Sequence, residues 1–384
     1  MSRTSRCRRG SPALSTSAVN DAQAPAASVL VDVIVPVHDV TRPIRRTVES
    51  ILDGTPAGQV RVLVICHNIP TAGIEAQLTG MLESGDVELI HFVDGIRSPA
   101  GPFNHGLTVA TAPHVSIMGS DDFLEPGAMA AWIAHVAGSN PDAALVPLRH
   151  QHGELLRNPL TRWHRSTHLD PVKDRLFYRT APLGLLRLDV VRRLGLEFTA
   201  GMPVGKDMAF SARMWTAGAR IDYLRTAPAY VIGADAESRV TTQARPIREA
   251  MAAVLDLVGR DWVAASSPQV RRSLVTKLLR IHVLGAAITR SSAGAWGPDD
   301  VADLRSSASA VAGHSPSAVA PLSRADRALL DAVLDSRSTV ESLVSATERH
   351  RTASRLDHIL TRNPFRMLAR ESNLTRFLLY RLDR

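Results

Sequence analysis

The stretch Val115 to Pro126 reads VSIMGSDDFLEP, a short apolar run that stops at two adjacent carboxylates, Asp121 and Asp122. Open α/β sheets bind their ligands at the carboxyl ends of their strands, so this order predicts that both carboxylates face a ligand site. Paired carboxylates supply the hard oxygen ligands that Mg²⁺ or Mn²⁺ prefers, and such a cation can be shared with a diphosphate. A turn followed by a helix N-terminus is the alternative interpretation, because Asp is common at both.

Strands and helices alternate around this stretch. Val29 to Val37 is a near-continuous apolar run, which is typical of a strand covered on both faces. Apolar residues then recur at helical spacing as far as Leu52, and Asp53-Gly54 ends that helix. The alternation predicts an α/β fold, with a mostly parallel sheet and helices on both faces. Further strands are expected over 60–66, 87–92, 143–148, 220–224 and 229–232, and further helices over 74–82, 105–110, 127–136 and 207–216.

The composition divides the chain into three parts. Residues 1–28 are rich in Arg, Ser, Ala and Pro and lack the apolar core of a secretory signal, so we expect a disordered basic leader. Residues 29–243 carry the strand and helix alternation. Residues 244–384 are rich in Ala, Leu and Arg with helical periodicity, which predicts a helical C-terminal region. Within it, Ser291 to Pro321 is predicted to be a linker or a long loop.

Composition and charge restrict the class of protein. Of the 384 residues 45% are hydrophobic, but no stretch approaches the eighteen or so apolar residues of a spanning helix, so no transmembrane segment is predicted. A net charge of +8 favours anionic partners, whereas 4% aromatic residues and no basic-aromatic motif argue against nucleic acid. Two cysteines, Cys7 and Cys66, indicate a reducing, cytoplasmic compartment, with Cys66 a buried spectator. No Gly-x-Gly-x-x-Gly follows the first strand, which argues against a dinucleotide-binding oxidoreductase.

Four separated segments follow one another in an order that points to a known family. They are VIVPVHD at 33–39 with the helix after it, FNHGL at 103–107 with Ala110, MGSDD at 118–122 with Pro126, and GKDMAF at 205–210 through Arg213. Together they resemble the inverting, nucleotide-sugar-dependent glycosyltransferases of family 2, which have the GT-A fold. Tyr230 and SRVT at 238–241 are similar to the trailing Tyr and Ser-x-Thr of that family. The resemblance covers about residues 29–241.

The resemblance implies a reaction. It implies transfer of a sugar, with inversion, from a nucleotide-diphosphate donor to a glycan, lipid-linked or cell-envelope acceptor. Asp122 and Asp121 match the metal-binding Asp-x-Asp region and would hold Mn²⁺ or Mg²⁺, with Asp121 also orienting the ribose or a metal-bound water. Asp207 matches the catalytic base, which takes the proton of the acceptor hydroxyl. As an alternative, Asp207 caps the helix that follows it.

The resemblance also implies where the nucleotide sugar binds. The first strand and the next strand end where this family holds the nucleobase and ribose, and a later helix begins near the same edge. The candidate donor-binding residues are Pro36, His38, Asp39, His67, Asn68, Asn104 and Asp121. Four of these have an alternative structural interpretation: Asp39 and Asn104 cap helices, Asn68 forms a turn, and His67 is solvated.

The chain departs from the family pattern at three places. ICHNIP at 65–70 replaces the usual Asp-Gly-Ser-x-Asp that reads the nucleobase, which leaves the nucleotide open. Gly119 replaces the first Asp of Asp-x-Asp, and Lys206 replaces the Glu before Asp207. Lys206 either lowers the pKa of Asp207 or contacts phosphate. These departures motivate an alternative function, a degenerate GT-A protein that binds nucleotide or glycan without turnover.

The C-terminal end mixes basic and apolar residues. Residues 350–384 contain eight arginines and three acids, and the last helix-forming stretch, 374–382, reads LTRFLLYRL. This mixture is typical of a helix that lies at a membrane surface, so we expect peripheral contact with anionic lipid at the inner face of the plasma membrane. The alternative is that Phe377, Leu378 and Leu382 pack onto the catalytic domain.

Overall fold

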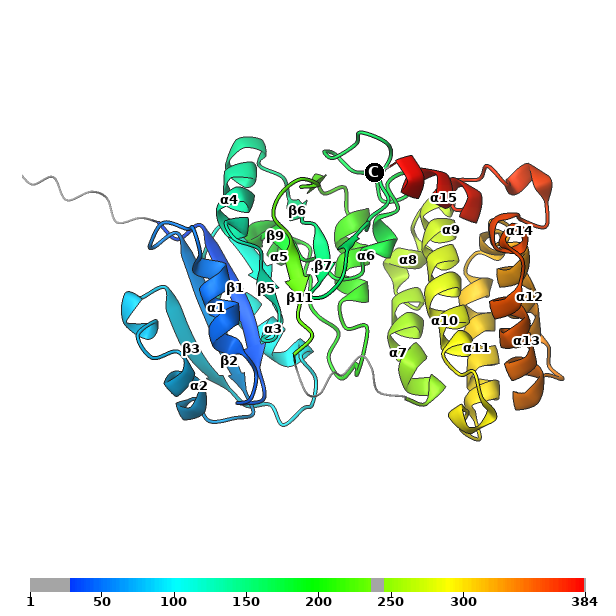
Figure 1. Cartoon of the computed structure of the whole chain (residues 1–384), viewed down its shortest axis with the longest axis horizontal. Helices are drawn as coiled ribbons and strands as arrows, with labels where there is room; N and C mark the ends of the chain where they lie inside the picture. Colours follow the sequence, from blue (N-terminus) through cyan, green and yellow to red (C-terminus); the bar gives the residue numbers. More distant parts are fainter. Residues whose placement is uncertain (1–27, 236–244, 383–384) are drawn as a thin grey trace, which may run out of the picture.

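The computed structural model describes residues 28–235 and 245–382 (Figure 1). Within these ranges two sheets with flanking helices form an α/β part, and a helical region follows from residue 247. Residues 1–27 of the predicted leader and the SRVT stretch at 238–241 lie outside the described residues.

The larger sheet carries the strands that the sequence predicts. In the described part of the chain it has seven strands in the order β10-β6-β9-β4-β1-β2-β3. Neighbours are parallel except β9, which runs antiparallel to both β4 and β6, so the expectation of a mostly parallel sheet is confirmed. The strands are β1 (Val31–Val37), β2 (Val60–His67), β3 (Val87–Phe92), β4 (His114–Ile117), β6 (Ala143–Leu145), β9 (Gly184–Arg187) and β10 (Ile221–Tyr223).

Helices cover both faces of this sheet, because alternate residues of its central strands enter two separate cores. Ile34 of β1 belongs to the core under α3 and α5, whereas Val33 and Val35 belong to the core under α1, α2 and α4. Gly106 lets α3 approach closely, since a Cβ there would lie 2.4 Å from the Ile34 side chain. The helices are α1 (Ile44–Leu52), α2 (Ala72–Gln77), α3 (Ala100–Val109), α4 (Ala128–Ser139), α5 (Leu188–Arg193) and α6 (Met208–Thr216), with short 3₁₀ turns η1 (Leu82–Ser84) and η2 (Leu176–Tyr178).

A smaller sheet lies next to the carboxyl end of β4. Its strands run in the order β5-β11-β7-β8. β11 is antiparallel to β5 and parallel to β7. Because β5 begins directly after Asp122, this pairing brings β11 and its Tyr230 to the two carboxylates. The bounds are β5 (Phe123–Leu124), β7 (Leu148–His150), β8 (Leu155–Leu156) and β11 (Tyr230–Ile232).

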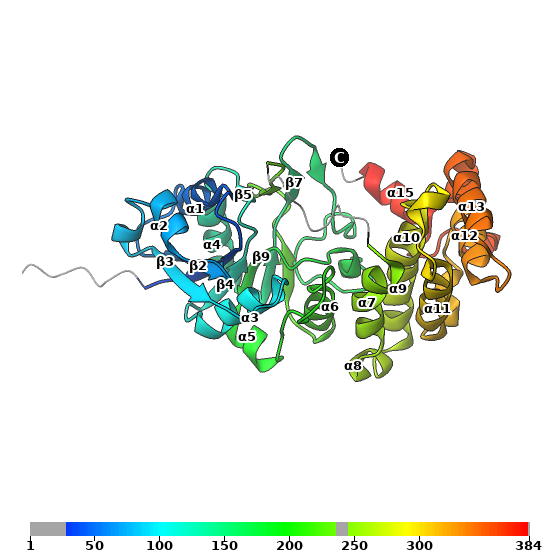
Figure 2. The ribbon, with the colours of Figure 1, turned by 90° about the horizontal axis from the view of Figure 1, so that it is seen from below.

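The helical region packs against α6 rather than standing apart (Figure 2). Met208 and Phe210 of α6 share one hydrophobic core with Met251 and Leu257 of α7. Its elements are α7 (Ile247–Val258), α8 (Asp261–Ala264), α9 (Pro268–Lys277), the π-helical η3 (Leu278–Val283), α10 (Leu284–Ile288), η4 (Ala293–Ala295), α11 (Asp300–Gly313), η5 (Pro316–Val319), α12 (Arg324–Leu334), α13 (Val340–Thr352), α14 (Arg355–Ile359), η6 (Pro364–Arg366) and α15 (Asn373–Leu382).

The predicted linker at 291–321 is wrong. α11 occupies its centre, with Leu304, Ala308 and Val311 fully buried at helical spacing. The Ser and Ala residues between them are small enough to let neighbouring helices pack closely. The segment is therefore helical although its composition is typical of a loop.

Two further expectations concern membranes and thiols. No helix within the described ranges is long and apolar enough to span a bilayer.

Cys66 is buried in β2, and burial raises the pKa of its thiol to about 11. Such a thiol is unreactive, which fits the prediction that Cys66 takes no part in function.

Candidate active site

A cleft of about 1160 Å³ opens at the carboxyl ends of β1, β2 and β4. The candidate residues that line it are Pro36, His38, His67, Asn68, Asp121, Asp122 and Asp207. α3 contributes Phe103 to its wall, and Arg245 lies on the side of the helical region. Side chains from distant parts of the chain therefore meet at the edge where a parallel sheet binds ligands.

Asp122 is held by a tyrosine and a backbone amide. Its Oδ2 accepts a hydrogen bond from the Tyr230 hydroxyl at 2.5 Å, and its Oδ1 accepts one from Gly233 N–H at 2.8 Å. Burial, and then Asp122, raise the pKa of the Tyr230 phenol well above its usual value. The phenol therefore stays protonated and donates to the carboxylate, while its oxygen accepts the Gly119 N–H at 3.1 Å.

Gly119 leaves room for the Asp122 carboxylate. A Cβ at position 119 would lie 2.5 Å from Asp122 Oδ2 and 3.3 Å from Asp121 Oδ1. The absence of the first Asp of Asp-x-Asp thus has a geometric reason, since the neighbouring carboxylate fills the space that a side chain would need.

Helix α1 fixes the loop that carries both carboxylates. Arg42, just before α1, forms an ion pair with Asp121 Oδ2 at 2.8 Å, and both side chains are largely buried. From within the helix, Thr47 Oγ1 donates to the Asp122 carbonyl at 2.7 Å and Arg46 donates to the Asp121 carbonyl at 2.7 Å. These bonds satisfy carbonyl groups of an irregular segment, which keeps the carboxylates in one arrangement.

The carboxylate pair fits a hard divalent cation that is shared with a substrate. Mg²⁺ is commonly held by one or two carboxylates together with phosphate oxygens. Arg42 pairs with Oδ2 of Asp121, and an ionised carboxylate offers about four acceptor positions. No group of three or more His, Cys, Asp or Glu side chains in the described residues is placed to hold a metal. A cation at this pair therefore needs further oxygens from a bound ligand.

At the end of β2 a hydrogen-bonded network replaces the usual acidic motif. His67, 4% exposed, bonds through Nε2 to Asp94 Oδ1 at 2.7 Å. Asn68 adopts a left-handed φ of 58°, and its Oδ1 accepts the N–H groups of Asp94 and Gly95 at 3.1 and 3.0 Å. Burial acts to raise the pKa of Asp94, but the bonds from His67, the Ile96 N–H and Asn68 together lower it. An ionised carboxylate is therefore kept beside the imidazole in a fixed position.

Asp207 occupies the N-cap position of α6, but its side chain makes no capping hydrogen bond and lines the cleft instead. The preceding turn depends on Gly205, whose φ is +73°. Lys206 also lines the cleft, with Nζ 5.6 Å from the centre of the Phe103 ring. Burial lowers the pKa of Lys206, and the Asp207 carboxylate opposes that shift.

A family model covers the segment that builds most of this site. Residues 32–195 match the model described as Glycosyl transferase family 2. Over this segment the chain is therefore similar to glycosyl transferase family 2. No curated protein sequence is significantly similar to the chain.

Solved structures share the fold of this glycosyltransferase. Residues 1–349 of S. aureus TarS align over 85% of this chain and 92% of that chain, with a TM-score of 0.65 and 15% identity. The complex of the same protein with UDP-GlcNAc gives a TM-score of 0.66 and 15% identity. The alignment covers 84% of this chain and 92% of the TarS chain. The mannosyltransferase PcManGT from Pyrobaculum calidifontis, in complex with GDP-Man and Mn²⁺, gives a TM-score of 0.47 and 16% identity. That alignment covers 85% of this chain and 88% of the mannosyltransferase chain. The TarS matches confirm the GT-A fold and extend through most of the helical region.

Two predicted donor-binding residues of the glycosyltransferase do not line the cleft. The amide of Asn104 is used between α3 and the Phe198 backbone, donating to its carbonyl at 2.9 Å and accepting its N–H at 2.8 Å. Asp39 Oδ1 accepts from the N–H and hydroxyl of Thr41, both at 2.8 Å, which is a local turn. Each side chain is engaged in a structural bond, and the donor contacts of both residues stay a prediction.

Cationic residues of the cleft were mostly missed by the sequence reasoning. Arg42 and Arg97 line the cleft, and each lies five residues beyond the end of a strand, β1 and β3 respectively. Their position shortly after a strand is the only feature of the local sequence that could have identified them as site residues. Burial, then the nearby Arg42, lower the pKa of His38, so the imidazole beside these cations is neutral at neutral pH.

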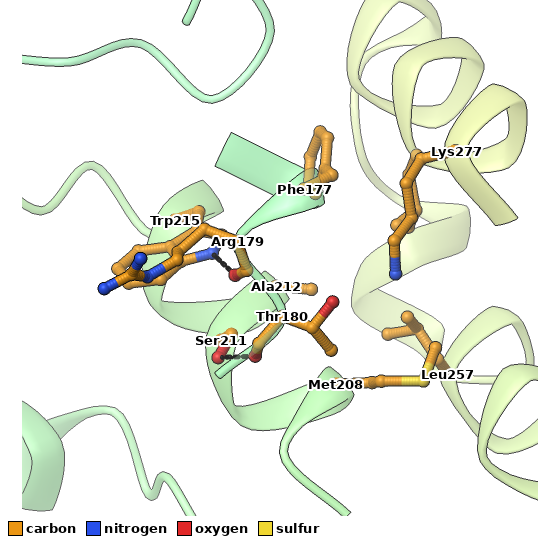
Figure 3. A pocket seen from close by; sticks show the side chains of 10 residues that line it. Phe177, Arg179, Thr180, Met208, Ser211, Ala212, Trp215, Leu257 and Lys277 are labelled. Carbon is orange, nitrogen blue, oxygen red and sulfur yellow. Dashed lines mark hydrogen bonds between the residues drawn. The ribbon is translucent and has the colours of Figure 1, made fainter. Parts of the chain in front are cut away.

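A second cavity, between α6 and α9, has a volume of about 10 Å³ and is lined by residues such as Thr180, Met208 and Lys277 (Figure 3). Such a space holds at most one water molecule, so it is no substrate site in the glycosyltransferase. Lys277 points toward it and is 3% exposed.

Proposed function

We propose that the cleft binds a nucleotide-diphosphate sugar and transfers the sugar, with inversion, to a hydroxyl of a glycan, lipid-linked or cell-envelope acceptor. The observation that carries the proposal is the presence of Asp121, Asp122 and Asp207 in the lining of one cleft. The match of residues 32–195 to glycosyl transferase family 2 and the UDP-GlcNAc complex of TarS support a nucleotide sugar as the donor.

The donor's base and ribose are assigned to the ends of β1 and β2. Pro36 and His38 line the cleft on one side, and the bonded pair of His67 and Asp94 lies beside Asn68 on the other. A pair held in one orientation discriminates between bases by hydrogen bonding, because a base edge that fails to match leaves a buried polar group without a partner. We therefore expect His67 to determine which nucleobase the donor carries.

The diphosphate is assigned to the carboxylate pair and the cations around it. Asp122, with Asp121, would hold Mn²⁺ or Mg²⁺ against the diphosphate, and when bound that cation stabilises the negative charge of the leaving group. Arg42 and Arg97 add positive charge to the same cleft, which attracts an anionic donor.

Asp207 is the proposed general base. Direct displacement at the anomeric carbon needs an acceptor hydroxyl that loses its proton as the new bond forms, and a carboxylate within hydrogen-bond reach accepts it. Because the Asp207 side chain does not cap α6, it is available to the cleft. Lys206 next to it offers a cation for an anionic group of the donor or the acceptor.

The test is turnover with a panel of nucleotide-diphosphate sugars and Mn²⁺, followed as nucleoside diphosphate release and sugar transfer. Asp207→Asn is expected to lose about 10²- to 10⁴-fold in turnover, as for removal of a general base, with donor binding by calorimetry retained. Asp122→Asn is expected to lose both turnover and Mn²⁺-dependent donor binding. Asp189→Asn, whose side chain is 59% exposed on α5, is the matched control and should keep wild-type activity.

Normal turnover in both cleft variants would refute the site assignment. Tight nucleotide binding by the wild-type protein without product from any acceptor would instead favour the degenerate binding protein. The proposed place of action is the cytoplasm, including the inner face of the plasma membrane, where nucleotide sugars and lipid-linked acceptors meet.

A further inference from the structure

Large apolar side chains are exposed together at the C-terminal end of the described chain. Phe365 is 94% exposed and Leu368 is 78% exposed. We call the following six residues the C-terminal surface: Leu356, Phe365, Leu368, Phe377, Leu378 and Leu382. They are six of the fifteen large apolar residues found exposed in the described residues, although residues 356–382 are a small fraction of the chain. α14 and α15, which carry four of the six, contact each other. Several exposed apolar residues in one region indicate an interaction site, whereas single ones do not.

Basic side chains accompany these apolar residues. Arg355, Arg366 and Arg370 are exposed, and no described carboxylate lies within ion-pair distance of any of them. The two acids among the described residues 355–382 are used elsewhere. Glu371 is buried and accepts from Ser273 at 2.8 Å, and Asp357 accepts from the Ser354 hydroxyl at 2.7 Å. The surface is therefore both apolar and positively charged.

α15 is fastened to the rest of the protein by residues other than those of the C-terminal surface. The Arg376 guanidinium lies 4.0 Å from the centre of the Tyr178 ring. Arg157 lies over the Tyr380 ring at 4.4 Å and donates to the Tyr380 carbonyl at 2.6 Å. Phe377, Leu378 and Leu382 remain 46–56% exposed, so the rest of the protein covers these side chains only in part.

We propose that the C-terminal surface docks onto an anionic lipid bilayer. Exposed Phe and Leu side chains bury in the boundary between headgroups and acyl chains, while arginines pair with lipid phosphates. The contact is peripheral, because no described helix is long and apolar enough to span a bilayer. Among the described residues of this segment, no acid is both exposed and unpaired, so its charge is complementary to anionic lipid headgroups.

The position of the surface leaves the cleft accessible. In Figure 1, α15 lies at the upper edge of the molecule, whereas α3 and the start of α7 lie at the lower edge. Phe103 of α3 and Arg245 before α7 line the cleft. Docking through the C-terminal surface therefore leaves donor entry open, and variants of the surface should retain turnover with soluble substrates.

The test is sedimentation of the full chain with lipid vesicles. Vesicles of phosphatidylcholine are compared with vesicles in which part of that lipid is replaced by phosphatidylglycerol. The wild-type protein should bind the anionic vesicles, less so as salt is raised, and bind the neutral ones weakly. Phe365→Ser with Leu368→Ser should weaken anionic-vesicle binding at least about tenfold, because two exposed apolar anchors are lost. Arg366→Gln with Arg370→Gln should remove most of the salt dependence.

The controls carry the same substitutions elsewhere. Leu255→Ser on α7 and Arg193→Gln on α5, where Arg193 is 62% exposed, should bind vesicles as the wild type does. The basic leader is present in every variant, so vesicle binding that survives loss of Phe365 and Leu368 would overturn the proposal. Gel filtration that shows a dimer dissolved by the same pair would overturn it as well. Vesicle binding needs no turnover, so this result is independent of the proposed reaction.

Discussion

At the scale of single residues, Gly119 decides where the Asp122 carboxylate lies. Its backbone needs no left-handed conformation, so Ala is permitted there, but the new Cβ would be 2.5 Å from Asp122 Oδ2. The carboxylate must then move away from the Tyr230 hydroxyl that holds it at 2.5 Å. We expect Gly119→Ala to lower turnover by about 10²-fold, since a displacement near 1 Å at a reacting group commonly has that effect.

Steady-state release of nucleoside diphosphate measures this effect. Gly138→Ala is the matched control, because no atom lies within 4 Å of a Cβ added at that α4 position. Turnover at the wild-type level in Gly119→Ala would mean that the position of the Asp122 carboxylate does not matter for the reaction.

The site residues that sequence reasoning found share one property, which is that they follow a buried strand directly or match a family motif. His67 and Asn68 end or follow β2, and Asp121 follows β4 closely. Arg97 comes from the loop between β3 and α3, and its approach to the cleft depends on how that loop folds back. No periodicity encodes such a path, so local sequence could not separate a site residue from a turn residue there.

At the scale of elements, the end of α9 carries a buried charge that the proposed reaction does not use. Lys277 Nζ lies 2.8 Å from His282 Nε2 in the π-helical η3. Burial lowers the pKa of Lys277 from 10.5 to about 8, opposed in part by Asp207, and burial and then Lys277 lower the pKa of His282 to about 3. The imidazole is therefore neutral and accepts the bond from the ammonium group at neutral pH.

This pair makes stability depend on pH with a defined sign. Between pH 8 and 10.5 the folded protein has released the Lys277 proton while the unfolded chain still holds it, so stability from this group rises as pH rises through that window. We expect a gain of about 3 kcal/mol across it in the wild type. Lys277→Met should lack this gain and be more stable near pH 7, because no charge is buried.

Urea unfolding at the two ends of the window measures the difference. Lys173→Met replaces an exposed lysine and should keep the wild-type pH dependence. Equal slopes of stability against pH in Lys277→Met and the wild type would show that the Lys277 amine titrates normally in the folded protein.

Elements were predicted well where their residues pack locally and less well where packing is long-range. β1 and α1 are set by an apolar run and a helical stripe within one stretch, and both were found. β9 runs against its neighbours because the chain returns after a long excursion, and no local pattern gives its direction. α11 was missed because small residues, rather than large apolar ones, form much of its packed length.

At the scale of the whole molecule, one continuous core joins the α/β part to the helical region. Ile34 of the sheet, Phe210 of α6 and Leu279 of the helical region belong to a single cluster of buried residues. The proposed division at residues 243 and 244 therefore separates two parts of the chain that share a core. Domains that share so much apolar surface unfold together, since separating them exposes it to water.

We accordingly expect thermal unfolding in one transition, and a donor bound at the sheet edge should stabilise the helical region too. A ligand at 100 times its dissociation constant adds about 2.7 kcal/mol to a single cooperative unit. Hydrogen exchange of α9 and α12, measured by mass spectrometry with and without a nucleotide sugar and Mn²⁺, tests this coupling. Neither helix is expected to contact the ligand, so protection there would report stabilisation of the whole unit. Slowed exchange in both helices is expected in conditions where exchange occurs by global unfolding. Protection confined to the α/β part, or two separate transitions in calorimetry, would show that the helical region unfolds independently despite the shared core.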